Sequence, residues 1–182
     1  MNRSLKLLLM GCLIVLLSGT LIGCAQNQSQ LKTVSNVELQ RYLGKWYEIA
    51  RLPNRFQNHC AGEVTADYKL LESGDIQVIN RCRDQQGEMD EAKGIGRIVD
   101  TGSNAKLEVS FVSLFGLNLF WGDYWILGLG ENYDYAVVGM PSRQYLWVLS
   151  RQTEMSTEDW QVVQMIVQAS GYDPSKLLIT NQ

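Results

Sequence analysis

The residues that could carry catalytic chemistry are few in this chain. Of its 182 residues, one is a histidine, His59, and four are cysteines. A zinc site needs several histidines or cysteines at close spacing, and a serine hydrolase needs a histidine together with a G-x-S-x-G turn. Neither pattern is present, and the glycine fingerprints of phosphate and dinucleotide sites are absent too. The sequence therefore predicts a protein that is not an enzyme and that has neither a metal ion nor a cofactor.

The amino-terminal residues predict export. Two basic residues precede an almost entirely apolar run, Leu7 to Ile22, which is the pattern of a secretory signal rather than of a membrane-spanning helix. The run ends in "LIGC", whose Cys24 resembles the acceptor of the lipobox in bacterial lipoproteins. That resemblance implies cleavage before Cys24, a lipid on its sulfur and an acylated amino terminus. The alternative is an ordinary signal peptide that happens to contain a cysteine.

The chain is expected to divide into three parts. Residues 1–23 form the lipoprotein signal peptide, residues 24–35 the lipidated amino terminus and a polar tether, and residues 36–182 one folded domain. Ala25, where an aspartate would imply retention in the inner membrane, favours the outer membrane and its periplasmic face. Without the two basic residues of the signal, 14 basic and 19 acidic residues remain, a formal charge of 14 − 19 = −5. No basic block stands out, so nucleic acid is not an expected partner.

Alternating apolar and polar residues predict eight short strands from Trp46 to about Arg151. An amphipathic helix follows, with Ser156 as its cap and Gly171 at its end, and the stretch "KLLIT" is a last strand. This order predicts an all-β domain with one C-terminal helix, built as an up-and-down barrel or as a sandwich.

A short helix is expected before the first strand. Ser35 and Glu38 have the spacing of a capping box, and Gly44 follows as a stop.

Three stretches resemble the signatures of the lipocalins, in the right order. "GKWYEIAR" at Gly44–Arg51 resembles the G-x-W signature, "YDYAVVG" at Tyr133–Gly139 the second signature, and "LWVLSR" at Leu146–Arg151 the third. The chain is most similar to the bacterial lipocalins of the outer membrane and to their animal relative apolipoprotein D. The second signature departs from the common pattern, with Tyr-Asp-Tyr where many members have Thr-Asp-Tyr. The resemblance implies an eight-stranded antiparallel up-and-down lipocalin β-barrel.

One end of such a barrel must be closed, and three residues are expected to close it. Trp46 would fill this floor with the Arg151 guanidinium stacked on it and capping backbone carbonyls, and Gly44 would let the preceding helix pass close by. We expect these three residues to be structural rather than to bind ligand.

The interior of the barrel is the expected ligand site. Strand alternation, counted from the floor, sends one set of side chains inward, and the family commonly uses its Tyr, Asn, Phe and Trp positions to contact ligand. The alternative is a filled core without a lumen. An apolar cavity with a few polar groups suits a fatty acid or a lysophospholipid. The expected ligand-binding residues are Glu48, Ala50, Val64, Ala66, Tyr68, Asn80, Phe111, Tyr124, Ile126, Trp147 and Leu149.

Two features are expected at the open end, or mouth. The up-and-down topology brings Cys60 and Cys82 to the same rim, where they form a disulfide or, as the alternative, remain free thiols. The Ser113–Gly122 loop is unusually apolar from Leu114 to Trp121, so it either docks on the membrane or a partner, or folds over the mouth as a lid.

These features together predict a lipid-anchored lipocalin that carries a small hydrophobic ligand in the cell envelope, in support of membrane maintenance under stress. The alternative is an envelope lipoprotein whose barrel is mainly a protein-interaction or dimerisation module, a homodimer included.

Overall fold

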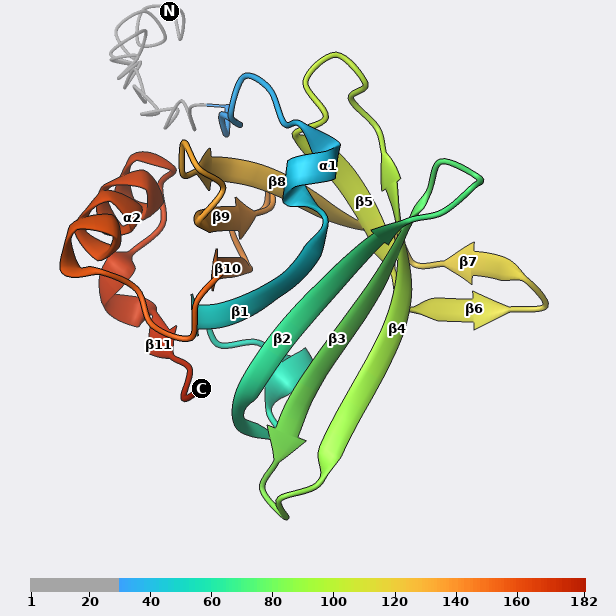
Figure 1. Cartoon of the computed structure of the whole chain (residues 1–182), viewed down its shortest axis with the longest axis horizontal. Coiled ribbons are helices and arrows are strands. Elements are labelled where there is room, and N and C mark those ends of the chain that lie inside the picture. Colours follow the sequence, from blue (N-terminus) through green and yellow to red (C-terminus); the bar gives the residue numbers. More distant parts are fainter. Residues whose placement is uncertain (1–29) are drawn as a thin grey trace, which may run out of the picture.

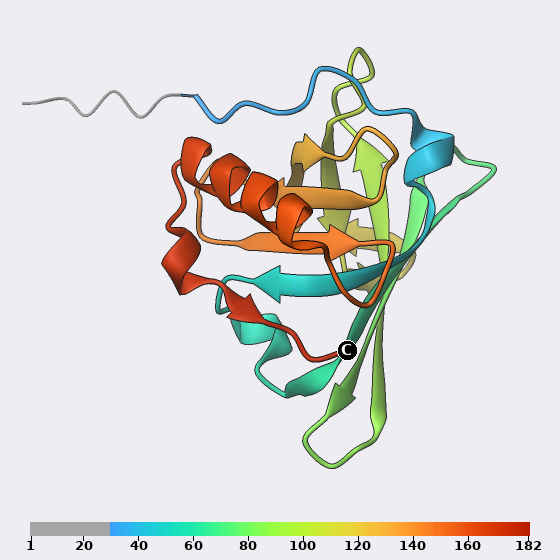
Figure 2. The same ribbon diagram turned by 60° about the vertical axis from the view of Figure 1, so that its left-hand side comes forward.

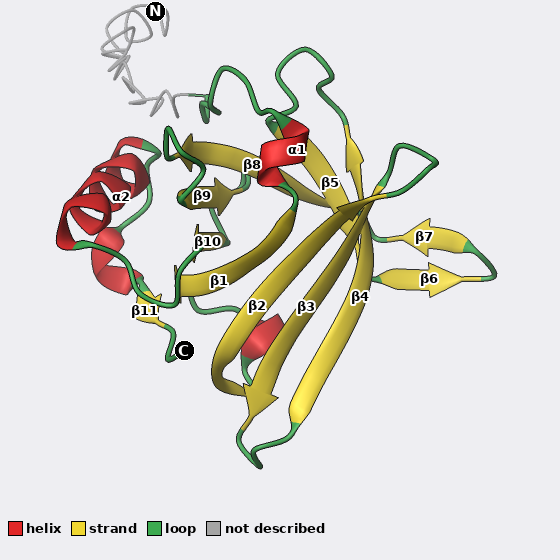
Figure 3. Ribbon diagram, viewed as in Figure 1, coloured by secondary structure: helices red, strands yellow, loops and turns green. Residues whose placement is uncertain are grey.

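A computed structural model describes residues 30–182 of the chain. The predicted signal peptide and the lipidation site, Cys24, lie outside the described residues. The elements, in chain order, are α1 Leu39–Tyr42, β1 Gly44–Arg51, the 3-10 helix η1 Arg55–Gln57, β2 Cys60–Leu70, β3 Ile76–Asp84, β4 Met89–Ile98, β5 Lys106–Ser110, β6 Val112–Leu114, β7 Leu117–Leu119, β8 Gly122–Leu129, β9 Tyr135–Gly139, β10 Leu146–Ser150, α2 Thr157–Ala169, the 3-10 helix η2 Pro174–Lys176 and β11 Leu178–Ile179 (Figure 1, Figure 3).

Eight antiparallel strands form a closed barrel. The strand order is β10-β9-β8-β5-β4-β3-β2-β1, and β1 also pairs with β10, with Glu48 opposite Leu149. Sequential neighbours pair throughout, apart from the small β6–β7 hairpin between β5 and β8. The barrel confirms the predicted fold class and excludes the sandwich. Among residues 30–182, no helix is both long enough and apolar enough to span a membrane.

Helix α2 lies on the outside of the barrel, over β8 and β9 (Figure 2). Its cap is the predicted one, because the Ser156 hydroxyl accepts a hydrogen bond from the Asp159 backbone N–H at 3.0 Å. Val163 and Val167 are fully buried against the outer face of the sheet. The helix therefore makes a second apolar core, separate from the core inside the barrel.

The first helix is shorter than the capping box predicted. It is a single turn that starts after Glu38, and Ser35 does not cap it. The reason is a tertiary contact: the Val37 backbone N–H donates to the Ser103 carbonyl at 2.7 Å, which holds the preceding residues extended along the barrel. The Val37 carbonyl, which a helix begun at Ser35 would bond to the Arg41 N–H, instead accepts from the Asn104 side chain at 3.1 Å.

The packed chain also begins earlier than the predicted boundary at residue 36. Leu31 is buried in the outer core with α2, and the Val34 backbone N–H donates to the Ile126 carbonyl at 3.0 Å. The second half of the expected tether is thus part of the folded body.

The C-terminal segment fills a seam in the barrel wall. β1 pairs with β2 only from Gly44 to Tyr47, and beyond that point β11 takes the place of β2, with Ile179 opposite Ala50. The Glu63 backbone N–H of β2 donates to the Asn181 carbonyl at 2.7 Å, so the segment is bonded on both sides. Toward the mouth, the wall between β1 and β2 is therefore made by residues 178–182.

Candidate ligand-binding site

The floor is closed by a stacked aromatic and guanidinium pair. Trp46 is 0% exposed, and the Arg151 guanidinium carbon lies 3.8 Å from the centre of its ring. The Arg151 side chain also donates to backbone carbonyls that include those of Arg41, at 2.6 Å, and Lys45, at 2.7 Å. Gly44 has φ +89°, and a Cβ there would lie 3.7 Å from Arg151, so the bend that admits the guanidinium depends on the left-handed backbone that glycine favours.

Three tyrosine hydroxyls meet just above this floor. The Tyr124 hydroxyl lies 2.6 Å from the Tyr42 hydroxyl and 2.9 Å from the Tyr68 hydroxyl. Burial raises the pKa of all three phenols, that of Tyr68 to about 12, so they are neutral at physiological pH. Two hydrogen bonds use two of the three hydroxyl protons, so one proton is left to donate to an acceptor.

The predicted lining residues fall into two groups along the barrel axis. Buried members of the inner core lie near the floor, and the wall becomes more exposed toward the mouth. Val64 is buried beside the C-terminal segment, whose Gln182 side chain donates to the Val64 carbonyl at 3.0 Å. The buried group is Ala66, Tyr68, Ile126 and Leu149, and the partly exposed group is Asn80, Phe111, Tyr124 and Trp147.

The inner face of β4 at Gly94 is covered by an aromatic ring. A Cβ at Gly94 would lie 2.7 Å from the Phe111 ring, which shows that the ring packs on the inner face of β4. Phe111 is nevertheless 41% exposed. The ring is therefore covered by β4 on one side and partly exposed elsewhere, and it could provide an apolar wall for an acyl chain.

One predicted lining residue is wrong. Ala50 is fully buried in the outer core, together with Val163 and Val167 of α2, rather than in the barrel interior. The cause is a β-bulge in β1: the pairing with β10 shifts between Glu48 and Ala50, so Ala50 lies opposite Val148 and Arg51 opposite Trp147. An extra residue reverses the alternation of side chains beyond it.

Glu48 is 2% exposed, but its carboxylate is already occupied. It accepts hydrogen bonds from Gln57 Nε2 at 2.6 Å, from the Thr180 hydroxyl at 2.5 Å and from Arg51 Nη1 at 3.1 Å. Gln57 Oε1 in turn accepts from Trp147 Nε1 at 2.9 Å. One carboxylate thus joins β1, the mouth loop between β1 and β2, and the C-terminal segment, residues 178–182.

Sequence reasoning missed several members of these clusters. Tyr42 lies on α1, outside any strand alternation, and Arg51 enters the network only because of the bulge. Gln57 and Thr180 come from the mouth loop and the C-terminal segment. An acidic side chain at an inward position predicts that hydrogen-bond donors surround it, because burying a charge without partners is unfavourable. The sequence does not indicate which residues provide these donors.

The cysteine pair at the rim is a disulfide, as predicted. Cys60 and Cys82 are joined, with their Cα atoms 5.6 Å apart. His59 lies beside the bridge and makes a hydrogen bond to Asp90, with 2.8 Å between Nε2 and Oδ2.

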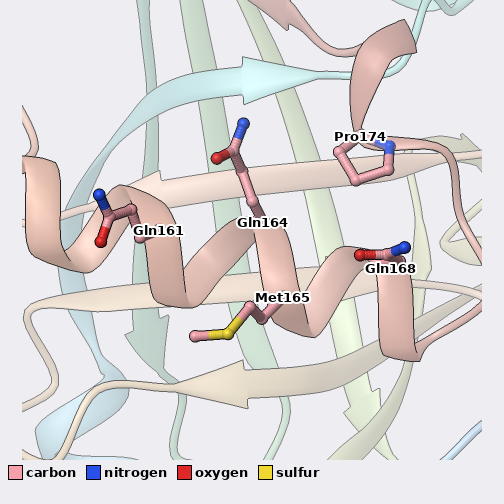
Figure 4. A pocket seen from close by; sticks show the side chains of 5 residues that line it. All are labelled: Gln161, Gln164, Met165, Gln168 and Pro174. Carbon is pink, nitrogen blue, oxygen red and sulfur yellow. The ribbon is translucent and has the colours of Figure 1, made fainter.

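One surface hollow lies outside the barrel. Figure 4 shows its lining on α2 and η2, namely Gln161, Gln164, Gln168, Met165 and Pro174. These side chains include no charged group, and we assign no ligand to it.

Comparisons with known proteins agree with this geometry. Residues 37–182 match the model of the lipocalin-like domain. The chain is 37% identical to the outer membrane lipoprotein Blc of Vibrio cholerae, over 93% of this chain and 96% of that protein. It is 38% identical to temperature-induced lipocalin-1 of Arabidopsis thaliana, over 85% and 84% of the two chains, and 30% identical to mouse apolipoprotein D, over 81% and 78%.

Solved structures share the fold at low sequence identity. Insecticyanin from the tobacco hornworm superposes with a TM-score of 0.67 at 22% identity, covering 84% of each chain. The cockroach allergen Per a 4 superposes with a TM-score of 0.64 at 19% identity, covering 84% of this chain and 94% of that one. The closed barrel, the stacked floor and these matches lead to one conclusion: the chain belongs to the lipocalin family.

Proposed function

We propose that the protein binds and carries a single-chain lipid, a fatty acid or a lysophospholipid, in the cell envelope. The observation that carries the proposal is the barrel interior, where an apolar lining surrounds three neutral hydroxyls with one proton to donate. An acyl chain can line the wall, and an oxygen of the ligand can accept the remaining proton.

Anchoring to the outer membrane is part of the proposal. "LIGC" provides Cys24 for lipidation, and the Vibrio cholerae relative is named an outer membrane lipoprotein. Only five residues lie between Cys24 and the first described residue, residue 30, so the two are about 20 Å apart at most. A role in membrane maintenance under stress fits a lipid carrier held at this distance from the bilayer. We propose binding rather than catalysis.

The test is a lumen-blocking variant. Ala92 is exposed although it pairs with Asn80 on the inward-facing side of β3 and β4, so Ala92→Trp should fill the mouth half of the barrel. We expect the full chain in detergent to retain at least tenfold less lipid, measured by native mass spectrometry and by displacement of a fluorescent fatty acid.

The control places the same tryptophan ring on the outer face of the barrel. Lys93→Trp, one residue away, should leave lipid retention unchanged because its side chain points to solvent. Equal retention by Ala92→Trp and wild type would contradict the proposal. An empty wild-type barrel that forms dimers would instead favour the alternative, an interaction module.

We propose further that the β6–β7 hairpin docks on the bilayer. It projects away from the barrel instead of covering the mouth (Figure 1), and Phe115 and Phe120 at its turns are 96% and 82% exposed. Both have positive φ, 51° and 57°, a conformation that disfavours bulky residues. Two aromatic rings held outward on a strained backbone have no stabilising contact in the barrel, and a membrane surface near the lipid anchor would provide one.

Removal of these rings should weaken membrane binding. In a chain that cannot be acylated, Cys24→Ser, the further changes Phe115→Ser and Phe120→Ser are expected to reduce liposome affinity at least tenfold, because each ring buries apolar surface worth about 1.5–3 kcal/mol. A sedimentation assay with lipid vesicles measures the liposome affinity of each variant.

The matched control removes two exposed apolar side chains from α2, with Val162→Ser and Met165→Ser. It should bind vesicles as the parent chain does. If both double variants bind alike, the hairpin is not the docking element.

A further inference from the structure

We propose that the rim disulfide covers a zinc site that forms when the bridge is reduced, with His59, Cys60 and Cys82 as ligands and Asp90 as the fourth. His59 Nε2 lies 3.7 Å from Cys60 Sγ and 3.8 Å from Cys82 Sγ. The ligand atoms of these three residues all lie within 4.8 Å of one another. Cysteine thiolate and imidazole are the ligands that Zn²⁺ prefers in proteins.

The histidine is already at its metal-bound distance from both sulfurs. With Zn–S about 2.3 Å and Zn–N about 2.0–2.1 Å in a tetrahedron, the separation of nitrogen and sulfur is about 3.6 Å. The two sulfurs would be about 3.8 Å apart in the same tetrahedron, against 2.01 Å in the bridge. Only the sulfurs must therefore separate, which rotation about the two Cα–Cβ bonds allows.

The strands hold these residues in place after the bridge opens. Cys60 begins β2, Cys82 lies on β3, and Asp90 of β4 is the Cα partner of Cys82 in the β3–β4 ladder. The Asp90 carboxylate already lies 2.8 Å from His59 Nε2, so it needs only a small shift to complete the tetrahedron. The backbone ladder that aligns the ligands does not depend on the disulfide.

The site is open to solvent on one side. The His59 and Asp90 side chains are each about half exposed, whereas Cys82 is buried. An ion can therefore enter without unfolding of the barrel, and the buried sulfur would hold it on the inner side.

The chemistry balances with a dithiol reductant. The dithiol gives two electrons and two protons to the Cys60–Cys82 bridge and is itself oxidised to a disulfide, leaving two thiols on the protein. Zn²⁺ then binds the two thiolates, and the two thiol protons pass to solvent. Exchange with an oxidised dithiol would reverse the step: it takes two electrons from the two thiolates and two protons from solvent, becomes a dithiol again, and leaves Zn²⁺ free and the bridge restored.

The test uses the full chain in detergent, reduced with a phosphine, desalted without oxygen and titrated with Co²⁺ and then Zn²⁺. We expect one ion per reduced chain, with the charge-transfer absorption of cobalt bound to thiolate, and no such binding by the oxidised chain. His59→Ala should weaken Zn²⁺ affinity at least tenfold and Asp90→Asn about tenfold. Asp75→Asn, which removes the same charge in the β2–β3 turn, should change nothing.

Three results would overturn the proposal. One is a cobalt spectrum without thiolate absorption. Another is metal affinity that is the same in His59→Ala and wild type, because two free thiols in an opened chain bind metal without the histidine. The double variant Cys60→Ser and Cys82→Ser should not bind Zn²⁺ tightly in either redox state, and a tight site in that variant would likewise rule the proposal out.

Discussion

Replacement of Trp46 with alanine is expected to lower the free energy of unfolding by about 3–5 kcal/mol, because it empties the barrel floor. The indole is fully buried, its Nε1 donates to the Tyr42 carbonyl at 2.8 Å, and the Arg151 guanidinium lies on its face. Without the ring, Arg151 would lie over a cavity, and no packed side chain would hold its guanidinium in position to donate to the α1 carbonyls. Urea denaturation followed by tryptophan fluorescence and circular dichroism measures the change.

A second stacked pair provides the control. The Arg97 guanidinium lies 4.0 Å from the centre of the Trp121 ring, but this pair is on the surface. Trp121→Ala should therefore have a much smaller effect than Trp46→Ala. If the two variants were equally destabilised, the stacked contact and not burial at the floor would be the source of stability.

Replacement of Glu48 with glutamine is the second change with a large expected effect, about 3–5 kcal/mol of unfolding free energy. The Glu48 carboxylate accepts hydrogen bonds from Arg51, Gln57 and Thr180. The glutamine amide has no charge, and its NH₂ group would face one of these three donors instead of accepting from it. Arg51 would then be a largely buried charge without a counter-ion among residues 30–182, and its Nε already has no hydrogen-bond partner in this part of the chain. Denaturant unfolding measures the loss, and limited proteolysis should show earlier cleavage of residues 178–182.

Removal of both charges tests the reason for the effect. The double variant Glu48→Met and Arg51→Met leaves no unpaired charge, so we expect it to be more stable than Glu48→Gln. Glu108→Gln, which breaks the exposed pair with Arg97, should barely change stability. If the double variant is no more stable than Glu48→Gln, the unpaired charge of Arg51 is not the cause of the destabilisation.

The parts of the fold that follow from local patterns were predictable. Strand alternation and the three signatures led to the eight strands, and the cap at Ser156 led to the start of α2. The stacking of Arg151 on Trp46 followed from the need to close one end of a barrel. Each of these depends on residues close in sequence or on a constraint that every barrel shares.

The parts that were missed depend on long-range pairing. The bulge after Glu48 lies where the pairing register between β1 and β10 shifts. No residue type in β1 indicates that a bulge forms there. The single turn at α1 results from a hydrogen bond between Val37 and Ser103, far apart in the chain. Ala50 was expected inside the barrel, but the bulge places it in the outer core. Which of the lining residues contact a ligand stays a prediction.

The pairing of β1 also sets the order in which the barrel can assemble. β1 pairs with β10 on one edge and, beyond Tyr47, with β11 on the other, and the contact between Arg51 and Thr180 spans 129 residues. The barrel therefore cannot close before β10 is made, and its wall between β1 and β2 is not complete before residues 178–182 are made. Such long-range pairing makes folding slow for a chain of this size.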